Sequence, residues 1–466
     1  MPTNHPVPPF AEHARSLLEK RRTRRIASFL IAMLLLIESS LVLAVDEGRD
    51  GSVLTDSVEK KEPPPLDTDA SPSLRIQIAP DLFLGARLQF SALRRENRDL
   101  AEEIEDDQTR LETLIDLAAQ ALPGEGLALF GEARLSRRRL SGDGEGLILE
   151  ESKIRLRRAY LLWSGFPIAS ADLQIGRQRF SDSREWLYDE NLDAVRMRVK
   201  GDLLDLELSV STNLLDPEEP EDEMRNYILY ATTRPGQKEK VSLYGIARRD
   251  RSEAGRDPTF LGISWRGRSI ENQRYWLEAA LVSGQDGSQA LRGYGFDLGW
   301  TSRFDSPIEP SFTIGYAFGS GDPDPDDRID RNFQQTGLQD NQAKFNGVVK
   351  FNYYGELFDP ELSNIIIGTA GVGIIPYSKT SIDLVYHYYS QVYAYLERPN
   401  VFRDAGVKRR PSGRSRDLGQ EVDLILGTKV IRNVQMALYS GIFMPGKAFP
   451  GSENAFFTEF KIQVSF

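Results

Sequence analysis

Two short stretches of the sequence carry positively charged residues at every second position. They are Lys153, Arg155 and Arg157 in the first stretch, and Arg196, Arg198 and Lys200 in the second. Because alternate residues of a β-strand share a face, each stretch predicts a row of three cations about 14 Å long. Such rows are suited to attracting anions. The net charge of −11 does not favour nucleic acid as that anion.

The residues needed for catalysis or metal binding are few. The chain of 466 residues has no cysteine and only three histidines, so a Cys/His metal site and a cysteine nucleophile are excluded. His387 alternates with apolar neighbours as in a β-strand. We interpret its side chain as facing the interior of a β-barrel or lying near a ring of aromatic residues at the barrel's edge. The acidic segment from Asp322 to Asp330 lacks the glycine and closing glutamate of an EF-hand, so we predict a solvated loop, with loose calcium binding as the alternative. We predict no catalytic residue, no metal site and no cofactor.

The last twelve residues, 455–466, indicate which elements hold these side chains. Their apolar residues fall mainly on one parity and their polar residues mainly on the other, as in a strand with one oily face. The apolar residues are Phe456, Phe460, Ile462, Val464 and Phe466. A transmembrane β-barrel needs such a strand to close, with its apolar side toward lipid. A strand of a secreted β-sandwich is the alternative.

The start of the chain predicts export. A basic run at Arg21–Arg25 precedes the uncharged stretch 26–37, and small residues at Val42 and Ala44 follow. This layout is typical of a signal peptide spanning residues 1–44. Residues 45–73 are rich in charge and proline and predict a disordered periplasmic lead. Residues 74–466 then predict one barrel, whose half-polar strands suit a mean hydropathy of −0.40.

Alternating segments separated by turn residues predict the strands. We count nineteen: 74–91, 109–121, 126–136, 147–163, 171–180, 192–200, 202–212, 225–233, 239–249, 258–267, 274–283, 291–302, 311–319, 343–354, 363–374, 379–394, 417–428, 432–444 and 455–466. An antiparallel barrel whose two chain ends both lie in the periplasm must have an even number of strands. We therefore predict an all-β, antiparallel transmembrane barrel of 18 strands, with 20 as the alternative. Short periplasmic turns such as 123–126 and 431–433 alternate with long extracellular loops, and the last of these turns is too short to plug the barrel.

Further basic residues fall opposite apolar neighbours and are assigned to the lumen, because an arginine facing lipid is costly. They are Arg87, Arg134, Arg266 and Lys350. Arg177 and Arg179 share the parity of Leu173 and Ile175, so either a bulge at Gly176 changes the register or these arginines lie above the lipid band. Acidic residues also fall on polar parities, which predicts a basic arc facing an acidic arc.

Four motifs are similar to signatures of the bacterial alginate-export outer-membrane family. They are residues 176–197 (GRQRFSDSREWLYDENLDAVRM), 316–347, 355–364 and 416–427. The resemblance implies an 18-stranded barrel whose arginine-rich lumen passes a polyuronate. In this sequence Arg177, Gln178 and Arg179 stand at the family's GRQ position, and Trp186 and Asp193 follow it.

Together these patterns predict an outer-membrane channel, not an enzyme, that passes an anionic, alginate-like polysaccharide. A general or substrate-specific porin for small, preferentially anionic solutes is the alternative. Expected partners are outer-membrane lipid and lipopolysaccharide, the transported anion and the barrel-assembly machinery, without nucleic acid. The predicted pore-lining residues are Arg87, Arg134, Lys153, Arg155, Arg157, Arg177, Arg179, Asp193, Arg196, Arg198, Lys200, Arg266 and Lys350.

Overall fold

The computed structural model describes Pro72 and residues 74–466, except 102–105, 143–145, 168–170, 183, 215–223, 237, 251–254 and 396–405. The predicted signal peptide and almost all of the predicted lead lie outside the described residues. Within the described part of the chain, no helix has the length and apolar character needed to cross a membrane.

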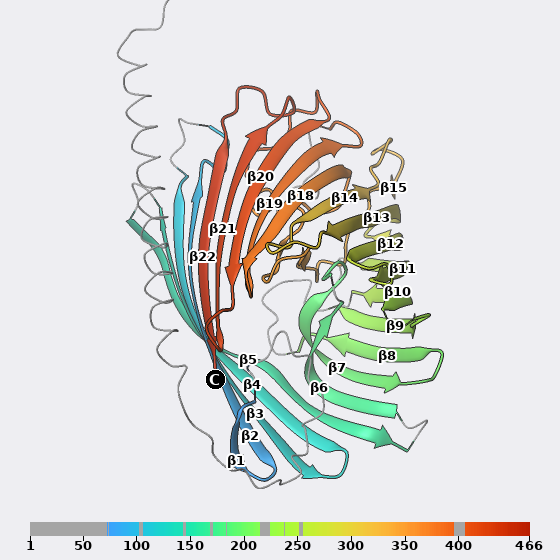
Figure 1. The fold of residues 1–466 in the computed structure, drawn as a ribbon. Coiled ribbons are helices and arrows are strands. Elements are labelled where there is room, and N and C mark those ends of the chain that lie inside the picture. The colour runs from blue at the N-terminus through green and yellow to red at the C-terminus, as the bar shows by residue number, and fades with distance from the viewer. Residues whose placement is uncertain are drawn as a thin grey trace, which may run out of the picture. The chain divides into compact units, whose positions relative to one another are not determined.

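Eighteen long strands form one antiparallel wall, in which each strand pairs with the next along the chain (Figure 1). The strands are β2 (Leu82–Glu96), β3 (Gln108–Gly124), β4 (Leu127–Gly142), β5 (Gly146–Phe166), β6 (Ala171–Ser181), β7 (Asp189–Val199), β8 (Asp205–Thr212), β9 (Arg225–Thr233), β10 (Glu239–Arg249), β11 (Arg256–Gly267), β12 (Gln273–Asp286), β13 (Gln289–Arg303), β14 (Ser311–Gly319), β18 (Ile365–Tyr377), β19 (Thr380–Gln391), β20 (Asp417–Thr428), β21 (Val434–Pro445) and β22 (Ala455–Ser465). The prediction of 18 strands is confirmed.

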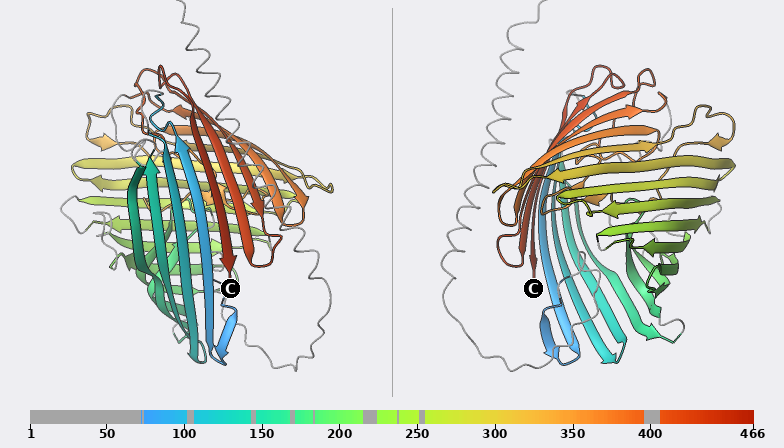
Figure 2. Two further views of the ribbon diagram at one scale, coloured as in Figure 1. Left: turned by 90° about the vertical axis from the view of Figure 1, so that its left-hand side faces the viewer. Right: turned by 45° about the vertical axis from the view of Figure 1, so that its right-hand side comes forward.

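The first and last long strands close the barrel. β2 pairs with β22 over ten residue pairs, from Arg87 with Ser465 to Glu96 with Phe456. The Phe466 amide also donates to the Ala86 carbonyl oxygen at 2.8 Å. Figure 2 shows β22 (red) beside β2 (blue) in the wall. The alternation at the C-terminus therefore identified the closing strand correctly, and a sandwich with free edges is excluded.

One predicted strand, residues 343–354, is wrong, which explains the odd count. This segment contains only β16 (Gln342–Ala343) and β17 (Phe351–Asn352), which form a small sheet of their own. Val349 and Phe351 are buried, but they pack inside the barrel instead of facing lipid. The remaining short strands are β1 (Ile76–Ala79), which extends the wall beside β2, and β15 (Ile329–Asp330), which pairs with β13 in parallel.

The connection between β14 and β18, residues 320–364, folds into the barrel and packs there; we call it the inner loop (Figure 1). Its aromatic residues stack on both sides of the lumen. Phe333 stacks on Trp186, which lies between β6 and β7, at 5.7 Å, and Phe358 stacks on Phe443 of β21 at 4.7 Å. The barrel interior is therefore a packed core on one side, and this loop decides where an aqueous passage remains.

Short and long connections alternate along the wall. Turns such as 125–126, 200–204 and 378–379 lie at the rim where the wall also ends at Phe466, which we call the turn rim. The connection 320–364 starts from the opposite rim, the loop rim, and the described residues that follow Glu96 and Gln391 lie at this rim as well. The strand predicted at 109–121 is present as β3, which begins one residue earlier, at Gln108.

Candidate functional site

The inner face of strands β2 to β5 is predominantly basic. Arg87 of β2 faces Asp116 of β3, which in turn faces Arg134 of β4 and then Arg155 of β5. The Nε atoms of Arg87 and Arg134 both donate to the buried Asp116 carboxylate, at 2.8 and 2.6 Å. Five arginines share two carboxylates here, an excess of three positive charges. The arginines are Arg87, Arg134, Arg155, Arg157 and Arg158, and the carboxylates are Asp116 and Glu132.

A register shift at Arg157 reverses which side chains of β5 point into the barrel beyond that residue. Glu132 pairs with Arg158, so Arg157 is an extra residue in the ladder. Both guanidinium groups reach the Glu132 carboxylate, Arg157 at 3.3 Å and Arg158 through its Nε at 2.6 Å. Beyond the shift Tyr160 points inward and stacks on Phe130, although in the sequence it shares the parity of the apolar Ile154 and Leu156 and would be assigned to the lipid face. The prediction also missed Arg158, although two adjacent arginines in a spanning strand are a signal of such a bulge.

A second basic surface surrounds a cavity of about 450 Å³ in the half of the barrel nearer the turn rim. Its lining includes the whole β7 row and Arg266 from the opposite side. Eight cationic residues and four acidic residues line it, an excess of four positive charges. The cationic residues are Arg179, Arg196, Arg198, Lys200, Arg234, Lys240, Arg266 and Lys350, and the acidic ones are Asp182, Asp205, Glu207 and Glu278. Lys240 was missed because apolar residues follow it on both faces of β10.

Two of the predicted pore-lining residues, Arg177 and Asp193, lie on the outer face of the wall. Arg177 pairs with Asp193 in continuous register through Gly176, so no register shift occurs there. The Arg177 guanidinium is 2.9 Å from Asp193, toward the loop-rim ends of β6 and β7. Arg179 lines the 450 Å³ cavity and pairs with the Asp189 and Glu185 carboxylates. Lys153 lies on the inner face of β5, 2.8 Å from Glu151.

Lys350 is a lining residue of two cavities. It belongs to the inner loop and not to a wall strand. It lines the 450 Å³ cavity and also a cavity of about 180 Å³ nearer the loop rim. Four cationic residues and two acidic residues line this second cavity. The cationic residues are Arg95, Arg110, Lys350 and Lys461, and the acidic ones are Glu356 and Glu459. We call the position of Lys350 the neck, since this residue lines both cavities.

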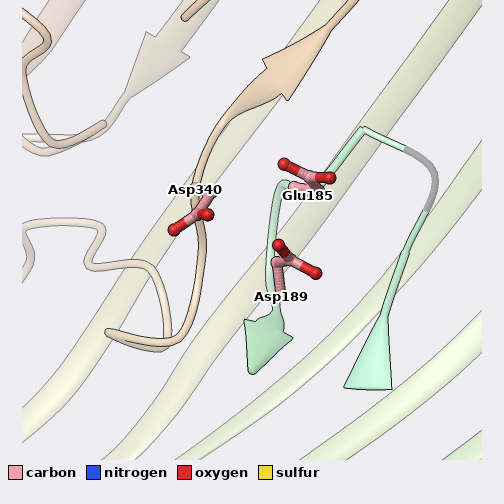
Figure 3. Close-up of side chains that lie close together, drawn as sticks. All are labelled: Glu185, Asp189 and Asp340. Atoms are coloured by element: carbon pink, nitrogen blue, oxygen red, sulfur yellow. The ribbon is translucent and has the colours of Figure 1, made fainter. Parts of the chain in front are cut away.

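Three carboxylates gather beside the neck: Glu185, Asp189 and Asp340 (Figure 3). Glu185 and Asp189 come from the β6–β7 connection and the start of β7, and Asp340 comes from the inner loop. Their oxygens lie within 4.8 Å of one another. The Lys350 ammonium donates to Glu185 at 2.8 Å and partly neutralises the group. The neck therefore holds a cation on the passage side with anions directly behind it.

The acidic side of the barrel holds the inner loop in place. Glu421 of β20 accepts hydrogen bonds from the amides of Leu357 and Phe358, at 2.7 and 2.9 Å. Asp297 of β13 forms a 2.9 Å ion pair with Arg184, whose guanidinium lies over the ring of Tyr353 of the inner loop. Both wall carboxylates are buried; Glu421 is bound by inner-loop amides and Asp297 by Arg184, so neither faces the passage.

Burial next to other carboxylates raises the pKa of Asp340 to about 7, with desolvation as the largest cause. The same causes raise the pKa of Glu185. A raised carboxyl pKa means that Asp340 is charged above about pH 7 and neutral below it. We therefore expect anion selectivity to increase when the pH falls from about 8 to about 6, because the neck loses negative charge. Reversal potentials in a salt gradient measure this.

Asp340→Asn should remove most of that pH dependence, whereas Asp326→Asn, an exposed carboxylate on the same loop, should keep it. An unchanged pH profile in Asp340→Asn would contradict the assignment.

His387 and the acidic segment differ in part from their predictions. His387 points to the barrel interior and is fully buried, with Nδ1 3.0 Å from the Thr369 hydroxyl. The predicted solvated loop is wrong at its ends, since Asp322 and Asp330 are buried. The Asp322 carboxylate lies 3.3 Å from the Arg331 guanidinium, and the Asp330 carboxylate accepts a hydrogen bond from the Asn332 backbone amide at 2.9 Å. These contacts make the segment part of the folded inner loop.

A closed barrel of 18 tilted strands, with an apolar outer face and a charged passage, defines an outer-membrane channel. The sequence model of the alginate export family matches residues 81–458. The chain belongs to this family, which confirms the resemblance seen in its motifs.

Curated relatives are consistent with the family. The chain is 25% identical over 367 residues to the alginate production protein AlgE of Pseudomonas aeruginosa, covering 66% of this chain and 73% of that protein. It is 27% identical over 164 residues to AlgE of Azotobacter vinelandii, covering 30% of this chain and 33% of that protein.

Solved structures share the barrel fold at low identity. OccK8 (OprE) of P. aeruginosa superposes with a TM-score of 0.55 at 10% identity, covering 83% of this chain and 98% of that chain. OccK11 (OpdR) of the same organism gives 0.53 at 13% identity, covering 83% and 96%. These likenesses concern the fold alone.

Proposed function

We propose that this outer-membrane channel passes an anionic polysaccharide, a polyuronate resembling alginate, along a passage between the inner loop and the basic wall. The observation that carries the proposal is the division of charge. Buried carboxylates of β13 and β20 are bound by Arg184 and by inner-loop amides, whereas basic residues of β2, β3, β6, β7, β10 and β11 line the cavities. A polymer with one carboxylate per sugar would meet a sequence of cations, and in a low-dielectric pore each attracts it strongly.

The relatives named alginate production protein favour a polyuronate over other anions. We also propose that the protein is a transporter without enzymatic activity, exported by its N-terminal signal peptide and folded by the barrel-assembly machinery. The second candidate is a porin for small anionic solutes. The small volume of the cavity on one side of Lys350, about 180 Å³, favours that candidate in one respect, because a small anion fits such a space more easily than a polymer does.

Planar-bilayer recordings of the full-length protein test the proposal. The wild type is expected to prefer chloride over potassium, and polyuronate oligomers are expected to interrupt the current more often than neutral dextran of the same length. Arg155→Glu with Arg157→Glu should reduce or reverse both preferences, because these side chains lie on the inner face.

Arg137→Glu with Arg139→Glu is the matched control, since these arginines are exposed on the outer face of the adjacent strand. A cation-selective wild type, or equal blockade by dextran, would contradict polyuronate transport. Chloride preference without polymer blockade would favour the small-anion porin.

A further inference from the structure

The outer face of the wall carries arginines where the apolar band ends near the loop rim. Arg225 of β9 faces Arg249 of β10 in the strand register. The next outward residue toward the turn rim on β9 is the exposed Tyr227, and Leu229 follows it. Arg292 lies on the outer face of β13, directly beyond the exposed Tyr294. These three arginines therefore lie at the polar edge of the lipid-facing surface.

Arg225 and Arg249 are like charges in directly opposite positions. Such cross-strand pairs destabilise a sheet unless an anion lies between or beside them. Among the described residues, the acceptors that hold the Arg249 guanidinium are neutral oxygens: the Thr259 hydroxyl at 3.1 Å and the carbonyl oxygens of Arg248 and Pro258. These bonds orient the guanidinium along the outer surface but leave its charge in place. The pair therefore offers a preoriented binding position for an anion.

The two edges of the apolar band differ in their chemistry. Near the turn rim the outward residues include Trp163, Trp265 and Trp300, which are partly exposed. Trp265 donates through its Nε1 to the Glu239 carboxylate, so this edge offers aromatic and acidic groups. Near the loop rim the edge offers tyrosines with arginines beyond them. In an outer membrane the long loops face outward, so the arginines lie at the headgroups of the outer leaflet.

We propose that Arg225 and Arg249 form a binding site for a phosphomonoester of an outer-leaflet glycolipid, with the chemistry of lipid A, and that Arg292 adds a third cation on the same surface. Guanidinium groups bind phosphate oxygens by charge-assisted, often paired hydrogen bonds. The acyl chains of such a lipid would lie along the outward leucines of β9 to β12, including the exposed Leu243, Leu261 and Leu281. The site is independent of what passes through the lumen.

Native mass spectrometry of the full-length protein in detergent tests the site. The probes are lipid A, its dephosphorylated form, phosphatidylglycerol and inorganic phosphate. The wild type is expected to bind lipid A most tightly, and Arg225→Gln with Arg249→Gln should weaken that binding about tenfold, equivalent to ~1.4 kcal/mol. Lys379→Gln with Arg432→Gln, at exposed positions in two turns of the opposite rim, is the matched control and should bind as the wild type does.

Equal lipid A binding by the wild type and the Arg225/Arg249 variant would overturn the proposal. So would equal binding of the dephosphorylated lipid, because the phosphate would then not be recognised, or equally tight binding of inorganic phosphate, because a lipid would then not be required. Unchanged reversal potential and polymer blockade in the variant show that the barrel is folded. They also separate this site from the proposed transport function, whose failure would appear in the wild-type recordings.

Discussion

Replacing Lys350 by glutamine is expected to reduce polyuronate blockade and anion selectivity more than any other single substitution of a passage residue. Lys350 is the lining residue common to the two cavities, and its ammonium donates to Glu185 at 2.8 Å. Its loss leaves the carboxylates of Glu185, Asp189 and Asp340 at the neck without that cation. Opposed charges about 4 Å apart interact by about 4 kcal/mol at an intermediate dielectric. We therefore expect at least an approximately tenfold fall in polymer capture rate, measured from the frequency of current blockades.

Two further variants make this result specific. Lys350→Gln with Glu185→Gln should recover part of the lost capture, because the variant removes one negative charge together with the cation. Lys429→Gln, in a turn at the turn rim, should leave capture unchanged. If Lys350→Gln captured polymer at the wild-type rate, the passage would run elsewhere in the barrel.

Replacing Arg184 by glutamine is expected to release the inner loop and raise the single-channel conductance by about twofold, with added current noise. The Arg184 guanidinium is buried, 2.9 Å from Asp297 and over the rings of Trp276 and Tyr353 at 4.3 and 4.0 Å. Removing one member of a buried ion pair leaves the other uncompensated, which costs about 3–5 kcal/mol. The loop is the element that can move away, whereas the wall is held by its ladder of hydrogen bonds.

Arg328→Gln serves as the control because Arg328 is exposed on the same loop. Wild-type conductance and noise in Arg184→Gln would show that Arg184 does not hold the inner loop. If unheated Arg184→Gln protein no longer gave the folded-barrel band in gel electrophoresis, Arg184 would instead be required for folding of the wall. The experiment therefore distinguishes a role in holding the loop from a role in folding the wall.

The wall could be predicted from the sequence because lipid imposes a simple rule on it. Each spanning strand must turn one apolar face outward, and the alternation in residues 455–466 or 239–249 follows directly. The inner loop obeys no such rule. Val349 and Phe351 alternate with Lys350 as strand residues would, but their apolar side chains are buried against other protein groups. Alternation alone does not distinguish burial in lipid from burial in a protein core.

The same ambiguity limited the site prediction. Parity assigned Arg87, Arg134 and Arg155 to the inner face, as the register shows. It failed beyond Arg157, where one extra residue exchanges the two faces. Parity placed the acidic residues on an inner arc but could not show what binds them. Arg184 and the loop amides that bind them lie far away in the sequence.

The attachment of the inner loop has a consequence for the order in which the molecule assembles. Gln335 and Thr336 of this loop donate to the carbonyl oxygens of Trp186 and Leu187, and 149 positions of chain separate each pair. The loop also reaches forward to Glu421 on β20. Contacts of such long range form only after the intervening chain has been brought together, and they slow folding. The wall from β6 to β20 must therefore be nearly complete before the loop docks, and the width of the channel is determined in the last steps of folding.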